Sequence, residues 1–313
     1  MTLEQLRAFV AVVEHGSIRA GARALGMAQS GLTQQVQRLE VAVGATLFTR
    51  SSSGISMTPY GTALLARARV VLSECAHAEE DFRHLRGELV GSVRVGMSVE
   101  AFARLAPPVI EQLRVEHPKV TVHIVSGPAS TLLTNIREGR SDFAITLVSH
   151  GTDMSDFTWK VLDHSEPCIL CRSGHPATAI KSVKALGAAL WVNTRPLGAV
   201  GTPSNRLADW FAMHSMPQPQ VVATLDSLFE TLHLVSQTDY LFLGPRVALG
   251  IGGFKDMLAE VPVHEALPGA DMCLIQPKHT ALSPAAKELA GMLASYANMI
   301  RRAAPSVTAR KRP

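Results

Sequence analysis

The stretch from Ile18 to Arg38 constrains the fold of this chain more than any other segment. Ser17 is a suitable cap for a short helix and Gly26 stands where that helix should end, because Ser is favoured at helix N-termini and Gly just past C-termini. A second helix should follow almost at once, because apolar residues then recur at i, i+4, i+7 and i+11. These residues are Leu32, Val36, Leu39 and Val43. The sequence therefore predicts two helices joined by a tight turn, with one apolar stripe of the second facing inward.

The other faces of the second helix are polar but almost uncharged. They carry Gln29, Ser30, Thr33, Gln34, Gln37 and Arg38. Amides and hydroxyls can donate and accept hydrogen bonds at base edges, and an Arg can bind a phosphate or a guanine. An ordinary solvated face is the alternative, although such faces usually carry more Lys and Glu. The composition favours a helix that lies in the major groove of DNA.

Two flanking segments complete this N-terminal unit. An amphipathic helix is expected from about Leu3 to Val13, where its apolar face would cover the two following helices. The segment from Thr46 to Thr58 contains a short hydrophobic strand, a Ser-rich turn and a second strand, which together predict a hairpin. Arg50 at the base of the hairpin is a candidate for a phosphate or minor-groove contact.

The run from Leu3 to Arg50 resembles the winged helix-turn-helix of LysR-type transcriptional regulators. The motifs that carry the resemblance are Gly16-Ser17, Ala24-Leu25-Gly26, Gln29, Leu32-Thr33, Arg38-Leu39-Glu40 and Leu47-Phe48-Thr49-Arg50. It implies that Gln29, Ser30, Thr33 and Gln34 read bases while Arg38 and Arg50 hold phosphates.

Three positions depart from the family pattern at the start of the recognition helix. Ala28 stands where the family usually has Ser or Thr, and Ser30-Gly31 replaces the usual Pro-Ala. Losing a hydroxyl cap and placing Gly within a helix each cost about 1 kcal/mol. This end of the helix should therefore be less stable than is usual in the family, and Ser30 is a candidate replacement cap.

A long helix should begin at Thr58-Pro59, because Pro is favoured at the first helical position. Apolar residues then recur at alternating spacings of four and three, namely Leu64, Ala68, Val71, Cys75, Ala78, Phe82 and Leu85. A heptad seam of this kind needs a second helix, either from its own domain or, as we favour, from a second copy of the chain. The resemblance implies a dimerising linker over residues 59–88 and a dyad-symmetric operator in double-stranded DNA.

Short aliphatic strands alternate with helices beyond residue 89, which predicts an α/β domain with a parallel sheet. Two such series follow each other, so we expect lobe one over residues 89–164 and 272–300 and lobe two over residues 165–271. The expected fold is thus α/β overall, with an all-α winged helix-turn-helix over residues 1–58. Two lobes with two crossovers resemble periplasmic solute-binding proteins and the LysR effector domain. Two segments, Gly139–Ile145 and Leu243–Arg246, resemble motifs of the first and second lobe of that effector domain.

The resemblance implies a small-molecule co-inducer between the lobes, held by loops after strands and by helix N-termini. Such N-termini favour anions, so we expect a small organic acid and no other cofactor. The matching residues are Ser98, Val99, Glu100, Ser130, Thr131, Thr146, Asn193, Thr194, Arg195, Thr202 and Ser227. For each hydroxyl residue the alternative is a plain helix cap. Arg195 would suit a carboxylate or a sulfonate, or would be an ordinary exposed Arg.

The formal charge of +4 says little about DNA binding by the folded part. Five cations, Arg301, Arg302, Arg310, Lys311 and Arg312, lie in residues 301–313, which hold no acid, and without them the charge would be −1. We expect this segment to be a disordered tail, with an auxiliary phosphate contact as the alternative.

The remaining sequence features exclude several classes of function. The four Cys residues suit reduced thiols, and Cys168 and Cys171 should point to opposite faces of a strand instead of forming a metal site. No hydrolase, P-loop, metalloprotease or dinucleotide motif is present, so an enzyme is not expected. Without an apolar membrane span or a signal sequence, we expect a cytoplasmic protein.

The protein would form a homodimer or homotetramer, with RNA polymerase as a further candidate partner. A solute-binding or transport component is the alternative that the two lobes leave open.

Overall fold

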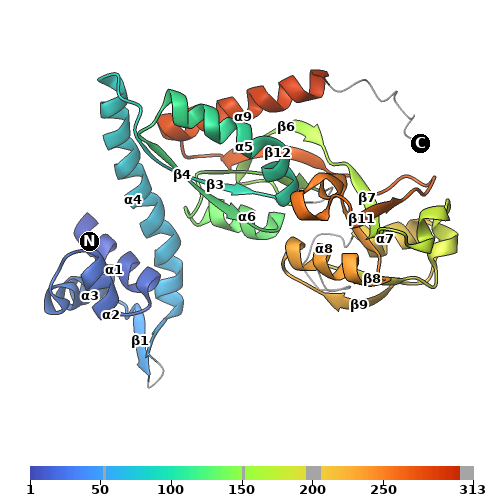
Figure 1. Cartoon of the computed structure of the whole chain (residues 1–313). Coiled ribbons are helices and arrows are strands. Elements are labelled where there is room, and N and C mark those ends of the chain that lie inside the picture. Colours follow the sequence, from blue (N-terminus) through green and yellow to red (C-terminus); the bar gives the residue numbers. More distant parts are fainter. Residues whose placement is uncertain (52–53, 150–151, 195–205, 304–313) are drawn as a thin grey trace.

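The computed structural model describes residues 1–51, 54–149, 152–194 and 206–303. A helical N-terminal unit is joined by one long helix to two α/β lobes that lie side by side (Figure 1). This arrangement confirms the fold class that the sequence predicted. The prediction of a disordered tail over residues 301–313 was wrong for residues 301–303, which form the end of the last helix, Pro284–Ala303. The rest of that tail and the predicted wing turn at residues 52–53 lie outside the described residues.

The N-terminal unit consists of α1 (Leu3–His15), α2 (Ile18–Ala24), α3 (Gln29–Val43) and a hairpin of β1 (Phe48–Ser51) and β2 (Gly54–Met57). Local capping explains the bounds of the first two helices. Thr2 and Gln5 form a capping box at the start of α1, and the Ser17 side chain accepts a hydrogen bond from the Ala20 amide at the start of α2. Phe9, at 0% exposed, lies at the centre of the resulting core.

Two expectations for α3 were wrong. The cap residue is Ala28, which has extended backbone and makes no side-chain cap, so Ser30 lies inside the helix and cannot replace it. The apolar stripe ends at Leu39, because Val43 in the last turn is 37% exposed and packs in no core cluster.

Helix α4 (Pro59–Leu85) starts as the sequence predicted, with the Thr58 hydroxyl accepting a hydrogen bond from the Gly61 amide. The two halves of its heptad seam differ in burial. Ala68, at 1% exposed, packs into the N-terminal core, whereas Val71, Phe82 and Leu85 are 41%, 66% and 81% exposed. The second half of the seam is therefore an uncovered apolar surface within the described chain.

Lobe one is built on a five-stranded sheet in the order β4-β3-β5-β12-β6. Its strands are β3 (Gly91–Met97), β4 (Val120–Ser126), β5 (Phe143–Val148), β6 (Phe157–His164) and β12 (Asp271–Pro277). The first three are parallel, and β12 is antiparallel to both β5 and β6. Helices α5 (Val99–Glu116) and α9 (Pro284–Ala303) share one core cluster with the sheet, and α6 (Ala129–Arg137) shares another.

Lobe two departs from the predicted parallel sheet. Its strands are β7 (Pro167–Arg172), β8 (Leu190–Asn193), β9 (Gln220–Thr224), β10 (Phe242–Pro245) and β11 (Leu258–Val261). Strands β8 and β9 are parallel, but β7 runs antiparallel between β10 and β11. The helices are α7 (Arg206–Met213), α8 (Leu228–Gln237) and the 3-10 turns η1 (Pro176–Ala179), η2 (Val183–Leu186), η3 (Arg246–Gly250) and η4 (Gly252–Phe254).

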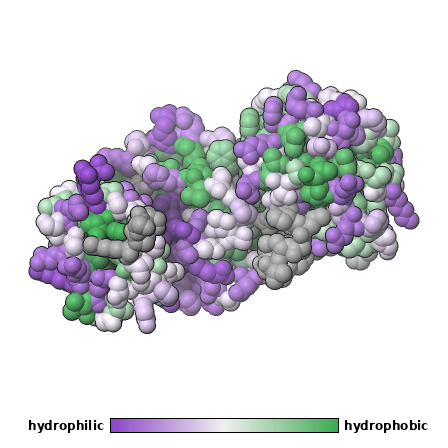
Figure 2. Space-filling view, turned by 90° about the horizontal axis from the view of Figure 1, so that it is seen from below, coloured by the Kyte–Doolittle hydropathy of each residue, from purple (hydrophilic) through white to green (hydrophobic). Residues whose placement is uncertain are grey.

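The two crossovers between the lobes are bonded to each other. The Ser165 amide donates to the Ala270 carbonyl oxygen at 2.8 Å, and the Ala270 amide donates to Ser165 Oγ at 2.8 Å. Hydrophobic side chains gather on the part formed by lobe two (Figure 2), whose exposed apolar residues include Met213, Val222 and Phe229. No helix in the described ranges is both long and apolar enough to cross a membrane.

Candidate DNA interface and effector site

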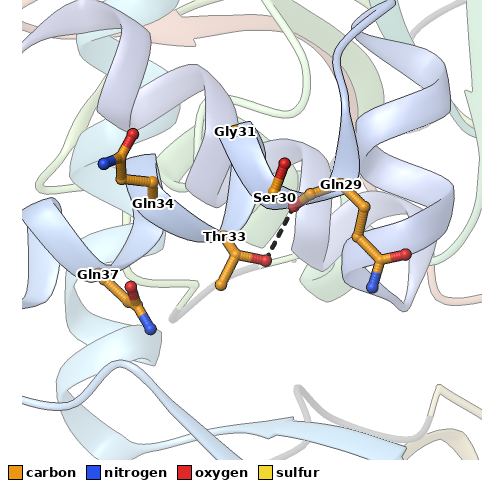
Figure 3. A pocket seen from close by; sticks show the side chains of 6 residues that line it. All are labelled: Gln29, Ser30, Gly31, Thr33, Gln34 and Gln37. Atoms are coloured by element: carbon orange, nitrogen blue, oxygen red, sulfur yellow. Dashed lines mark hydrogen bonds between the residues drawn. The ribbon is translucent and has the colours of Figure 1, made fainter.

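The polar face of α3 is exposed and points away from the core. Six residues, Gln29, Ser30, Gly31, Thr33, Gln34 and Gln37, line one hollow on this face (Figure 3). Arg38 is also exposed. Within the described chain, the side-chain amides of Gln29, Gln34 and Gln37 have no hydrogen-bond partner. Their donors and acceptors are therefore available to an external ligand, as base reading requires.

Thr33 differs from these neighbours because its hydroxyl is already used. Thr33 Oγ1 donates to the Gln29 carbonyl oxygen at 2.9 Å, one helical turn earlier. The side chain is also partly buried, whereas Gln34 and Gln37 are exposed.

Glu40 fixes the wing to the recognition helix, a role that the sequence reading missed. Its Oε1 accepts hydrogen bonds from the Leu47 amide at 2.7 Å and from the Phe48 amide at 3.4 Å, just where β1 begins. Glu40 belongs to the Arg38-Leu39-Glu40 motif, but the motif gave no partner for its carboxylate. Arg50 lies in β1 opposite Ile55, and its side chain is outside the described part of the chain, so its DNA contact stays a prediction.

Helix α4 connects this interface to lobe one. Arg69 forms an ion pair with Glu14 of α1 at 3.6 Å. A Cβ on Gly139 of lobe one would lie 3.3 Å from Val70 Cγ2, so the turn after α6 packs directly on the helix. His77 Nε2 lies 3.8 Å from Asp142 Oδ1. The linker helix thus contacts both the DNA-binding unit and the effector domain.

The His77 contact is electrostatic and reaches into the sheet. The Asp142 carboxylate, 3.8 Å from His77 Nε2, raises the pKa of His77, and the nearby carboxylates of Glu74 and Glu80 act in the same direction, while burial opposes them. Asp142 Oδ2 accepts from the Arg94 amide at 2.7 Å, and the Asp142 amide donates to the Arg94 carbonyl oxygen at 2.7 Å. The Asp142 carboxylate is therefore hydrogen-bonded to β3, and Asp142 itself directly precedes β5.

The expected effector residues of lobe one fall into two groups. Ser98 caps α5 by accepting from the Ala101 amide at 3.3 Å, and Val99 is 36% exposed. Ser130 and Thr131 are exposed in the first turn of α6, a helix whose cap residue, Pro128, supplies no side-chain bond. These first-turn amides and hydroxyls are suitable for an anionic group.

Glu100 and Thr146 lie differently from the expectation. Glu100 is 4% exposed and Thr146 is 1% exposed, so neither presents a free side chain in this arrangement of the lobes. Glu100 Oε1 accepts from the Glu166 amide at 3.2 Å and from Arg104 at 3.5 Å, and it thereby anchors the first crossover. Burial raises the pKa of Glu100, against the opposing effects of the Glu166 amide, Arg104 and Arg206.

The expected residues of lobe two lie at a strand end and at a helix start. Asn193, at the end of β8, accepts from the Thr194 amide through its side-chain oxygen at 3.0 Å. Ser227 caps α8 by accepting from the Glu230 amide at 3.4 Å. Arg195 and Thr202 lie outside the described residues. For Ser98 and Ser227 the alternative reading as helix caps is confirmed.

The cysteines are placed as the sequence predicted. Cys168 and Cys171 belong to different core clusters and so point to opposite sides of β7. Burial raises the pKa of Cys168 to about 12 and that of Cys171 to about 11, so both stay protonated at neutral pH. In the described part of the chain, no three His, Cys, Asp or Glu side chains are arranged to hold a metal ion.

An exposed recognition helix with a wing, joined by a long helix to a two-lobed α/β domain, defines a DNA-binding regulator of the ligand-responsive class. Two family models agree with this architecture. Residues 3–62 match the bacterial regulatory helix-turn-helix protein of the lysR family, and residues 86–298 match the LysR substrate binding domain. The chain belongs to the LysR family and is a transcriptional regulator with an effector-binding domain.

Known relatives extend over the whole chain. The HTH-type transcriptional regulator GbpR of Azospirillum brasilense is 28% identical over 307 residues, which cover 97% of this chain and 89% of GbpR. A full-length OxyR variant from Pseudomonas aeruginosa has a TM-score of 0.70 and 21% identity, covering 100% of this chain and 99% of OxyR. CbnR complexed with its target DNA has a TM-score of 0.67 and 18% identity, covering 97% of this chain and 100% of CbnR. The two structures show a shared fold.

Proposed function

We propose that this protein is a cytoplasmic regulator that binds a dyad-symmetric operator as a homodimer or homotetramer, and that a small organic acid between its lobes changes this binding. The single observation that carries the proposal is the exposed face of α3, whose three Gln amides have no partner within the described chain. Gln29, Ser30, Thr33 and Gln34 would read bases, with Arg38 and Arg50 on phosphates.

The proposed domain division follows the function. Residues 1–58 would bind DNA, residues 59–88 would dimerise and residues 89–300 would bind the effector. The exposed half of the α4 seam supports dimerisation, because Phe82 and Leu85 are too apolar to be left in water without a cost. The hydrophobic surface of lobe two (Figure 2) supports further assembly through the effector domains.

The proposed effector is anionic because the uncapped first turn of α6 offers amide N–H groups beside Ser130 and Thr131. Asn193 and Thr194, together with Arg195 and Thr202, would hold it from lobe two. The effector can act only if it binds one lobe arrangement better than another. Strands β3 and β5 provide a route for this change, because Asp142 and Arg94 connect them to His77 of the linker helix.

Base reading and phosphate binding can be separated by two substitutions on α3. Gln34→Ala should reduce affinity for the operator while leaving affinity for random DNA unchanged, because it removes a base contact. Arg38→Ala should weaken binding to both about equally and reduce the salt dependence by about one phosphate contact. Both are measured by fluorescence anisotropy over a range of salt concentrations. Equal losses on operator and random DNA for Gln34→Ala would contradict the base-reading role.

A further inference from the structure

We propose that Thr33 selects its base through its methyl group, by packing on the 5-methyl group of a thymine. The proposal rests on the proposed function, in which α3 lies in the major groove. It differs from the expectation drawn from the sequence, in which a Thr hydroxyl forms a hydrogen bond with a base edge.

The first support is that the hydroxyl proton is already donated. Thr33 Oγ1 donates to the Gln29 carbonyl oxygen at 2.9 Å. A Thr hydroxyl has one proton to donate. Thr in a helix adopts this position readily, because one of its two favoured rotamers allows the bond to a carbonyl one turn earlier. Thr33 therefore has no free donor for a base.

The second support is the direction of the methyl group. Figure 3 shows Thr33 Oγ1 turned back along the helix towards Gln29, with the methyl carbon projecting away from the ribbon into the hollow. The side chain is short and partly buried among longer, exposed Gln side chains. A group that projects from a base edge can reach it, and the thymine methyl is such a group.

The third support is the chemistry of the surrounding face. Of the six residues that line the hollow, Thr33 is the one whose side chain ends in a methyl group, since the others are Gln29, Ser30, Gly31, Gln34 and Gln37. Thymine is likewise the one standard DNA base with a methyl group in the major groove, and apolar contact with a Thr methyl is a known way to recognise it. The amides around Thr33 would then bond neighbouring bases and fix the register.

The test removes one methyl group at a time from each partner. Operators are first selected with the full-length protein from a random double-stranded DNA library. Each thymine of the selected sequence is then replaced singly by deoxyuridine, which keeps the pairing and the O4 acceptor but lacks the 5-methyl group. For wild-type protein, replacement of one particular thymine in each half-site should lower affinity about fourfold, the effect of exposing one methyl-sized group.

Two variants separate the methyl group from the hydroxyl. Thr33→Ser keeps the hydroxyl and its helix bond but lacks the methyl group in both subunits of a dimer. It should therefore bind about 16-fold more weakly, about fourfold for each half-site, and should bind thymine and deoxyuridine operators equally. Thr33→Val keeps a methyl group at the same position and loses the hydroxyl. Its affinity should stay within about twofold of wild type, and it should keep the deoxyuridine penalty.

The outcomes are distinct. If Thr33→Ser keeps the deoxyuridine penalty, or if Thr33→Val loses affinity while Thr33→Ser keeps it, the hydroxyl is the reading group and the inference is overturned. A selected consensus without any deoxyuridine-sensitive thymine also overturns the inference while leaving the proposed function intact. Failure of wild-type protein to select any sequence would overturn the proposed function itself.

Discussion

Replacing Gly31 with Ala should stabilise the recognition helix, whereas the same replacement at Gly61 should destabilise the N-terminal unit. At Gly31 a new Cβ would meet only Met27 Cε, at 3.9 Å, so it fits without strain. The helix gains about 0.5–1 kcal/mol, because Gly loses more backbone freedom on folding than Ala. At Gly61 the Cβ would lie 2.3 Å from the Leu47 carbonyl oxygen, which is backbone and cannot simply rotate away. Overpacking of this kind costs about 1–3 kcal/mol.

Hydrogen exchange with mass spectrometry on the two full-length variants measures both effects locally. In Gly31→Ala, amides of residues 29–43 should exchange about two- to fivefold more slowly, and peptides from the effector domain should not change. In Gly61→Ala, amides of β1, β2 and the start of α4 should exchange faster. Faster exchange of α3 in Gly31→Ala would refute the assignment of an open, strain-free site, and an unchanged Gly61→Ala would refute the close approach of Leu47.

Three further predictions concern the wing, the linker and the dimer. Glu40→Ala should weaken binding to operator and random DNA alike, because the carboxylate that accepts from the Leu47 amide is lost, whereas Glu40→Gln, which keeps an acceptor oxygen, should bind more nearly as wild type in anisotropy titrations. The difference in Tm between wild type and His77→Gln should be larger at pH 6 than at pH 8.5. The reason is that the pKa of His77 is higher in the folded protein than in the unfolded chain. The stability that charged His77 contributes is therefore complete at pH values below its ordinary pKa and is lost as the pH rises through the raised pKa. A pH-independent difference would show that the Asp142 contact does not depend on the charge of His77. Phe82→Asp should shift the protein towards monomer in analytical ultracentrifugation, because a charge would enter the exposed apolar half of the α4 seam; an unchanged sedimentation coefficient would place the dimer contact elsewhere.

Local signals in the sequence predicted the N-terminal unit well. Ser17, Thr58 and Gly26 each act through hydrogen bonds or backbone conformations that involve only nearby residues, so their types indicate where helices begin and end. The recognition face was predicted for a similar reason, since the apolar residues of α3 leave only one face for Gln34 and Gln37.

Features that depend on distant partners were missed or placed wrongly. Strand β6 was overlooked, although Phe157, Trp159 and Val161 alternate with polar residues along it. The alternation does not mark a buried face, because Trp159 and Val161 are exposed. The antiparallel direction of β7 depends on its neighbours in space, which periodicity does not reveal. The heptad pattern of α4 identified an apolar face but not which half of it Ala68 would bury within the same chain.

In the candidate effector site, too, local features were predicted from the sequence, whereas contacts with distant residues were not. Ser98 and Ser227 were found because helix starts attract hydroxyl residues, and both hydroxyls are used as the helix caps that the sequence offered as the alternative. Glu100 was placed at the right strand end, but its burial depends on Arg104 and on the crossover at Glu166. The contact between His77 and Asp142 joins two elements far apart in the sequence, and neither residue type indicates its partner.

DNase footprinting on the DNA upstream of the gene for this protein, with and without pools of small organic acids, tests the central claim most directly. The account predicts a long, dyad-symmetric protected region that weakens with salt and changes in extent when one pool is added. The acids of that pool, tested singly, would identify the effector. Absence of any sequence-preferring protection, over the whole range of salt concentrations and with every pool, would contradict the assignment of α3 as a DNA reader controlled by the two lobes.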